Sequence, residues 1–142
     1  MLLTEYSTLR QYERNRSSMI DQTIQDVVTA ERIGNAVIIT LGDRMDIFNA
    51  PLVIREFDEL LAGGMSHFIV DLSAVRVVDS DGDYPLLHLL KCAQTTGGNV
   101  TLVCPEGNPI CIFYEMMRLD TLFDIVPSLD VARTRYDLST TL

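Results

Sequence analysis

The sequence predicts a single α/β domain whose sheet is mixed or parallel and whose strands are joined by helices. The length of 142 residues suits one domain with a short appendage, and 47% hydrophobic and 22% charged residues are typical of an ordinary globular protein. From residue 36 onward, short apolar runs alternate with longer segments in which apolar residues have a helical spacing. This alternation implies helical crossovers between strands of one sheet.

The first predicted element is a β-hairpin. Residues 27–32 and 36–41 are two apolar-rich segments on either side of Gly34 and Asn35. A pair of this kind between two strand-like segments is typical of a tight hairpin turn. The chain is therefore expected to begin its ordered part with two antiparallel strands.

A helix is predicted to follow the hairpin, with Asn49 as its capping residue and Pro51 in its first turn. Apolar residues recur on one face of this helix, which is expected to end at Gly63 and Gly64. The run HFIVDL at residues 67–72 is apolar almost throughout, as in a central strand that is covered on both faces. The later elements are predicted at residues 75–78 (strand), 85–93 (helix), 100–104 (strand), 110–119 (helix), 123–126 (strand) and 129–136 (helix).

The chain is expected to divide into three parts. Residues 1–21 are polar and mixed in charge, so they are predicted to form a mobile N-terminal extension. The folded domain is expected at residues 22–132, and residues 133–142 are expected to be a C-terminal tail.

The charge balance excludes one class of partner. The net charge is −9 and Lys91 is the only lysine, whereas nucleic-acid binders need clusters of Lys and Arg to neutralise phosphates. No apolar run of about 18 residues is present, so direct membrane insertion is not expected. The N-terminus has no apolar signal core, so a cytoplasmic protein is predicted.

The cysteines are expected to be reduced. Three cysteines, Cys92, Cys104 and Cys111, cannot all pair within the chain, and Cys92 and Cys104 lie in strongly apolar stretches. Reduced thiols in the core of a cytosolic protein are the simplest interpretation.

The segment 79–83, Asp-Ser-Asp-Gly-Asp, is the densest polar cluster between apolar elements, and it follows a predicted strand. In α/β sheets such loops usually carry the function. Ser80 comes just before a helix, so Ser80 or Asp81 could simply cap that helix. Alternatively, Ser80 is a phosphoacceptor, because a phosphoryl group gains from a helix N-terminus. Next to several aspartates its charge would make the loop a switch surface.

A metal site is less favoured. Asp79, Asp81 and Asp83 alternate as at the start of a calcium loop, but Gly82 is in the fourth position and not the sixth. No glutamate closes the loop at the twelfth position. We therefore predict no metal ligands and no cofactor.

An enzyme is not predicted. His67 and His88 each lie in an apolar run, which is more typical of structural histidines than of catalytic ones. The motifs of phosphate-binding loops, serine hydrolases and zinc proteases are absent. A hydrolase built on two carboxylates stays open, although no pair stands out among the 20 acidic residues.

Four segments in order resemble the STAS-domain family of anti-sigma factor antagonists. Residues 77–90, VVDSDGDYPLLHLL, are similar to the family's Asp-Ser-Ser/Thr-Gly loop before an apolar helix. Residues 68–80, FIVDLSAVRVVDS, are similar to its preceding strand with Asp-Leu-Ser. Residues 41–61 look like its Leu-x-Gly-x-Leu-Asp motif with the first helix, and residues 116–125 like its Leu-x-Gly-Leu-x-x-Leu-Phe ending. The resemblance covers residues 23–132.

The resemblance implies a STAS-like single domain with a mixed sheet of four to five strands and about four helices. It also implies a partner, an anti-sigma factor that is a serine protein kinase, which is bound when Ser80 is unphosphorylated and released when Ser80 is phosphorylated. Asp79 matches the motif aspartate and Asp46 the acidic residue of a neighbouring loop. The partner-binding residues are then expected to be Asp46, Asp79, Ser80, Asp81, Gly82, Asp83 and Tyr84.

Some positions differ from the family pattern. Asp81 replaces the usual second Ser or Thr, Tyr84 replaces a small residue, and Arg118 stands where Gly is usual. A non-phosphorylated STAS scaffold or interaction subunit in a larger signalling or membrane-associated assembly is therefore the alternative. In that case Tyr84 and the N-terminal extension would serve oligomer contacts, including a homodimer.

Overall fold

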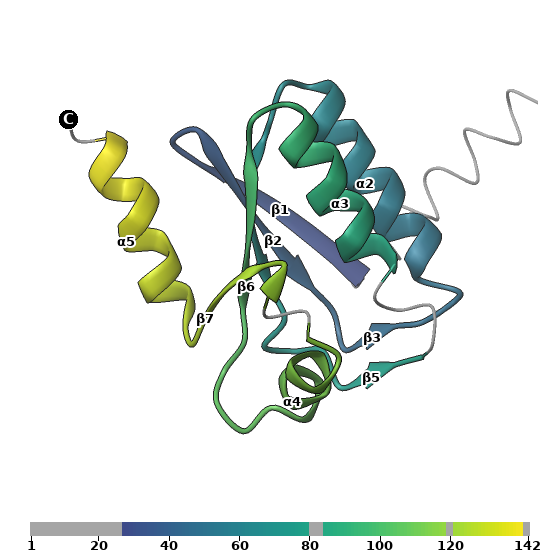
Figure 1. Ribbon diagram of the computed structural model, residues 1–142. Coiled ribbons are helices and arrows are strands. Elements are labelled where there is room, and N and C mark those ends of the chain that lie inside the picture. Colours follow the sequence, from purple (N-terminus) through teal and green to yellow (C-terminus); the bar gives the residue numbers. More distant parts are fainter. Residues whose placement is uncertain (1–26, 80–83, 119–120, 141–142) are drawn as a thin grey trace, which may run out of the picture.

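The computed structural model describes residues 27–79, 84–118 and 121–140, and these residues form an α/β domain (Figure 1). Five strands form one sheet in the order β1-β2-β4-β6-β7. Strand β1 is antiparallel to β2, and all other neighbours in this sheet are parallel. The described residues contain four helices, α2, α3, α4 and α5. The mixed five-stranded sheet and the helix count confirm the predicted fold class.

The strands of the sheet are β1 (Val28–Ile33), β2 (Ala36–Leu41), β4 (His67–Asp71), β6 (Asn99–Val103) and β7 (Asp124–Val126). The hairpin β1–β2 turns at Gly34 and Asn35, as predicted, and Gly34 has a φ of 58°. Such a positive φ is accessible to glycine without steric cost. The register pairs Val28 with Leu41 at the open end of the hairpin.

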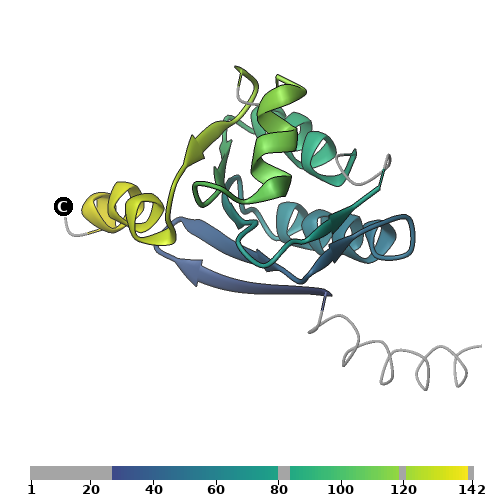
Figure 2. The same cartoon turned by 90° about the horizontal axis from the view of Figure 1, so that it is seen from below.

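Helices cover both faces of the sheet. Helices α2 (Ala50–Ala62) and α3 (Tyr84–Thr95) lie on one face, and α5 (Leu129–Thr140) lies on the other (Figure 2). The short helix α4 (Pro109–Met116) packs at the end of the sheet on the side of α2 and α3.

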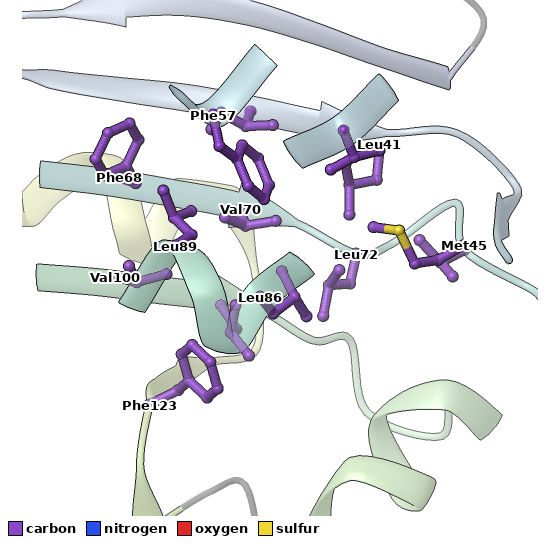
Figure 3. Close-up of a cluster of buried hydrophobic side chains, with 14 of the residues drawn as sticks. Leu41, Met45, Phe57, Phe68, Val70, Leu72, Leu86, Leu89, Val100 and Phe123 are labelled. Atoms are coloured by element: carbon purple, nitrogen blue, oxygen red, sulfur yellow. The ribbon is translucent and has the colours of Figure 1, made fainter. Parts of the chain in front are cut away.

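Successive side chains of the central strands point to opposite faces of the sheet and so form two separate cores. In β4, Phe68 and Val70 face α2 and α3, where they meet Phe57 and Leu89 (Figure 3). Ile69, between them, faces the opposite way and belongs to the smaller cluster under α5. A strand buried on both faces must be apolar at consecutive positions, which explains the unbroken HFIVDL run.

Helix α2 begins differently from the prediction. Asn49 precedes it, but the Asn49 side chain does not cap the helix; its Nδ2 donates to the carbonyl oxygen of Arg44 at 3.0 Å. The prediction of a capping asparagine is therefore wrong. Pro51 is in the first turn and Gly63 follows the last residue, both as predicted, and the Gly63 N–H closes the helix on the carbonyl oxygen of Glu59.

A second, two-stranded sheet was not predicted as such. Strand β3 (Arg44–Met45) pairs in parallel with β5 (Val77–Val78) beside the main sheet. The loop that leads into β3 is also bound to β5, because the carbonyl oxygen of Asp43 accepts from the N–H groups of Arg76 and Val77 at 2.8 and 3.1 Å. A strand of two residues is too short to show a period in the sequence.

The cysteines correct one prediction. Cys104, directly after β6, and Cys111, in the first turn of α4, are joined by a disulfide, whereas reduced thiols were expected. Cys92 on α3 is free. Sequence alone could not pair Cys104 with Cys111, because the pairing depends on where α4 returns to the sheet.

Candidate functional site

The candidate site lies where β3 and β5 end. Because these strands are parallel and in register, the residues that directly follow them, Asp46 and Asp79, come to the same edge (Figure 1). The Asp79 carboxylate reaches across, and its Oδ2 accepts from the N–H of Ile47 at 2.9 Å. The β3–α2 loop and the segment after β5 are therefore tied together by a side chain.

Asp46 organises its own loop. Its Oδ1 accepts from the N–H groups of Phe48 and Asn49 at 3.1 and 2.9 Å, and its Oδ2 pairs with Arg44 Nη2 at 3.0 Å. Only 7% of Asp46 is exposed. The N–H of Asn49 is the main cause that keeps the pKa of Asp46 below its ordinary value; the N–H of Phe48 and the charge of Arg44 add to it, and burial acts in the opposite direction.

The predicted phosphorylation site lies outside the described residues. Ser80, Asp81, Gly82 and Asp83 fall between the described segments, so their predicted roles stay predictions. The described flanks are Asp79, at the edge of the paired loops, and Tyr84, the first residue of α3. The predicted loop therefore begins beside the Asp46 loop and ends at the N-terminus of a helix.

Several exposed apolar side chains lie on the segments that form this edge. Ile47 and Phe48 follow Asp46, Val77 belongs to β5, and Tyr84 opens α3; their exposed fractions are 57%, 81%, 48% and 59%. Of these, only Tyr84 was predicted to bind a partner. Ile47 and Phe48 come before the residues that give α2 its helical period, so the pattern did not place them in the core. Two large apolar residues outside any such period were the signal that could have identified this exposed surface.

A second cluster joins α2 to α3 next to this edge. His88 Nε2 lies 2.8 Å from Asp58 Oδ1, and the Tyr84 ring stacks on His88 with centroids 6.2 Å apart. Cys92 Sγ lies 3.9 Å from the same Nε2. A thiol–histidine–carboxylate relay uses the two ring nitrogens separately, so one shared nitrogen does not build a catalytic triad. His88 therefore has a structural partner, as expected for a histidine in this helix.

The described residues offer neither a metal site nor a membrane span. Among them, no group of three or more His, Cys, Asp and Glu side chains is arranged to hold a metal ion. Helices of the described residues are also too short or too polar to cross a membrane.

This fold is similar to that of known STAS-domain proteins. A family model of the STAS domain matches residues 27–132. No curated protein matches the chain. A candidate anti-sigma factor antagonist from Thermotoga maritima has a similar structure with a TM-score of 0.67 and 24% identity, covering 77% of this chain and 93% of that chain.

Two further solved structures have the same fold at lower identity. SpoIIAA, an anti-sigma factor antagonist from Bacillus, is similar in its phosphorylated form with a TM-score of 0.62 and 15% identity, covering 77% of this chain and 98% of that chain. A sulfate transporter family protein from Wolinella succinogenes has a TM-score of 0.63 and 14% identity, covering 78% of this chain and 93% of that chain.

Proposed function

Because the chain belongs to the STAS domain family, we propose that it is an anti-sigma factor antagonist that acts by partner switching. In its unphosphorylated state it would bind an anti-sigma factor that is also a serine protein kinase, and phosphorylation of Ser80 would release that partner. The protein itself would bind and not catalyse, so ATP would belong to the kinase. The observation that supports this proposal best is the joining of the Asp46 loop to Asp79, the residue before Ser80.

The described residues supply a surface suited to a protein partner. Phe48 and Tyr84 are large, apolar and exposed on the segments around Ser80, and aromatic side chains are enriched among the residues that dominate binding energy at interfaces. Asp46 and Asp79 use their carboxylates to fix these segments. The partner would thus meet a preorganised edge, which lowers the entropic cost of binding.

The same edge would respond strongly to a phosphoryl group. Phosphorylation of Ser80 adds about −1.5 to −2 charges near neutral pH. Asp79 precedes Ser80 directly, and Asp46 is a second carboxylate at this edge that is ionised near neutral pH, since its pKa lies below the ordinary 3.8. A new, strongly hydrated anion beside exposed apolar side chains would disfavour a partner that fits the neutral form. The N-terminus of α3 would favour the anion within the protein.

The test compares affinity-tagged Ser80→Ala and Ser80→Glu proteins expressed in the native cells, with captured proteins quantified by mass spectrometry. We expect Ser80→Ala to retain a serine kinase of the anti-sigma factor class and Ser80→Glu to retain at least about tenfold less, which corresponds to about 1.4 kcal/mol. Thr134→Glu, which adds a charge on α5, is the matched control and should behave as the unaltered protein. Equal capture of the kinase by both Ser80 variants would contradict the switch.

A scaffold role is the second candidate. It is favoured by the likeness to the sulfate transporter family protein and by Asp81, a fixed negative charge next to Ser80. Mass spectrometry of the protein from native cells distinguishes the two candidates. Ser80 phosphorylation that varies with growth or stress supports the switch, whereas an unmodified Ser80 in all conditions supports the scaffold.

A further inference from the structure

We propose that Cys104 and Cys111 form a redox-modification site whose oxidant is a low-molecular-weight disulfide. In this view, oxidation of the two thiols makes the bridge present in the structure and thereby fixes α4 to the sheet. The two cysteines are seven positions apart in sequence, one directly after β6 and one in the first turn of α4. The inference concerns this end of the molecule and does not depend on Ser80.

Besides the bridge, α4 is held by buried side chains and by its capping residue. Ile110 and Tyr114 are buried against the main core, and Asn108 caps the helix through Oδ1, which accepts from the N–H of Ile110 at 2.9 Å. Asn108 Nδ2 also donates to the carbonyl oxygen of Ser73 at 3.4 Å, which is a long hydrogen bond. The bridge is thus the covalent tie between α4 and the central strand β6.

The outward side of α4 is mostly apolar, so its position matters to the surface of the protein. Its large exposed apolar side chains are those of Ile112, Phe113 and Met116, and Met117 directly after the helix adds another; Glu115 is an exposed charged residue of the same helix. A helix of eight residues is too short to be stable unless it is anchored. The oxidation state of the two cysteines would therefore decide how firmly this apolar surface is held in one place.

A permanent staple is a poor explanation of the bridge. The domain has a continuous core on both faces of its sheet, and a chain of this size does not need a disulfide to fold. A bridge across so short a loop also restricts the unfolded chain less than one across a long loop.

The bridge would form by two successive thiol–disulfide exchange steps. Cys111, in the first turn of α4, attacks one sulfur of the small disulfide as its thiolate and releases one small thiol. Cys104 then attacks the Cys111 sulfur of the mixed disulfide, and the second small thiol leaves. The protein loses two electrons and two protons, and the small disulfide is reduced to two thiols. Access to the buried sulfurs comes from local opening of α4.

The first measurement titrates the pair in the full chain carrying Cys92→Ser, which removes the third thiol. The protein is equilibrated with mixtures of reduced and oxidised glutathione, quenched in acid, and labelled with a maleimide before mass measurement. We expect species with zero or two labels whose ratio changes reversibly with the glutathione mixture. Two labels in fully oxidised glutathione would overturn the proposal, and so would a bridge that reduced glutathione never opens.

The second measurement asks whether the bridge anchors α4. Hydrogen exchange of the peptide that covers residues 109–116 is compared between the oxidised and reduced forms, with the β4 peptide 67–71 as internal control. We expect exchange in α4 to become at least about fivefold faster on reduction, and exchange in β4 to be unchanged. The double variant Cys104→Ser/Cys111→Ser should match the reduced form in every glutathione mixture. Equal α4 exchange in both oxidation states would overturn the anchoring role.

Discussion

At the residue scale, the buried carboxylate of Asp46 shows how a polar side chain prepares a surface without being part of it. Both of its oxygens are occupied, by two backbone N–H groups and by Arg44. What reaches solvent is the next pair of residues, Ile47 and Phe48. Asp46 therefore acts on a partner through the conformation that it gives to its neighbours.

The lowered pKa of Asp46 makes a prediction about stability and pH. Because the folded pKa lies below the ordinary 3.8, the ionised carboxyl stabilises the fold above that pH, and this contribution is lost as pH falls through the folded pKa. Asp46→Asn should therefore lower the free energy of unfolding at neutral pH, and the difference from the unaltered protein should shrink in acid. Urea unfolding followed by circular dichroism from about pH 7 to about pH 3 measures this difference.

Glu56→Gln is the matched control, because the pKa of Glu56 is shifted in the other direction. Burial is the main cause that raises this pKa above its ordinary 4.5, and the nearby charge of Glu59 adds to it. The charged form is thus disfavoured in the fold, so Glu56→Gln should stabilise the protein at neutral pH and lose this advantage below the ordinary pKa. The two variants should differ from the unaltered protein with opposite signs at neutral pH; the same sign for both would contradict the assignment.

Phe48 is predicted to contribute to partner binding but little to the stability of the fold. Its side chain is 81% exposed, so Phe48→Ala should change the free energy of unfolding by no more than about 0.5 kcal/mol. Loss of an aromatic residue at the centre of an interface usually costs more than about 1 kcal/mol, so capture of the kinase should fall at least about fivefold. Met116→Ala is a control of similar exposure, 77%, on α4. Unaltered capture by Phe48→Ala would remove Phe48 from the proposed interface.

At the element scale, Gly98, directly before β6, is a position where a side chain would not fit. Helix α3 ends and the chain turns back so that the Gly98 N–H reaches the carbonyl oxygen of Ala93 and the Asn99 N–H reaches that of Ser66, at 2.8 and 3.0 Å. A Cβ at position 98 would lie 1.7 Å from the carbonyl oxygen of Ser66. The first residues of β4 and β6 can approach only because Gly98 has no side chain.

Gly98→Ala should therefore destabilise the protein by about 3 kcal/mol, because the obstacle is backbone and the two strand ends must separate. Gly63→Ala is the matched control. A Cβ there would have its nearest neighbours at 3.5 Å, an ordinary contact, so stability should stay the same or rise by about 0.5 kcal/mol. Chemical unfolding of both variants measures the contrast, and equal effects would show that the close approach at Ser66 does not limit the fold.

The elements also show how far sequence reasoning reaches. The hairpin was predicted from its turn residues, Gly34 and Asn35, between two strand-like segments. Helix α2 and the central strand β4 were predicted because one has a clear apolar period and the other an unbroken apolar run. Strand β3 has two residues, and its pairing with β5 is a contact between distant segments that leaves no local pattern. The same reason applies to the hydrogen bond between Asp79 and Ile47: the sequence marked Asp79 but not what it holds.

At the scale of the whole molecule, the sheet divides two different cores. The large cluster lies under α2, α3 and α4, whereas the small one lies under α5 and consists of residues of β2, β4, β6, β7 and α5. Sequence reasoning placed the apolar residues of these strands in the interior, but the pairing of Cys104 with Cys111 required the three-dimensional path of the chain. The Ser80 loop stays a prediction from the motif and from the described residues on either side of it.

The small core makes a prediction about where the domain ends. Residues after 132 were expected to be a tail, and α5 runs on to Thr140. Arg135 pairs with Asp124 of β7, and Tyr136 packs against the small cluster and lies 6.2 Å from the ring of His67. Because these contacts close the second face of the sheet, a chain that ends at residue 132 should be less stable than the full chain by about 2 kcal/mol.

A chain that ends at residue 136 is the matched control for this truncation. It keeps Arg135 and Tyr136, so its free energy of unfolding should stay within about 0.5 kcal/mol of the full chain. Thermal and urea unfolding of the three chains decide between the two boundaries. If the chain ending at residue 132 unfolds like the full chain, the contacts of α5 beyond that position contribute nothing to stability, and the domain ends where the sequence alone placed its boundary.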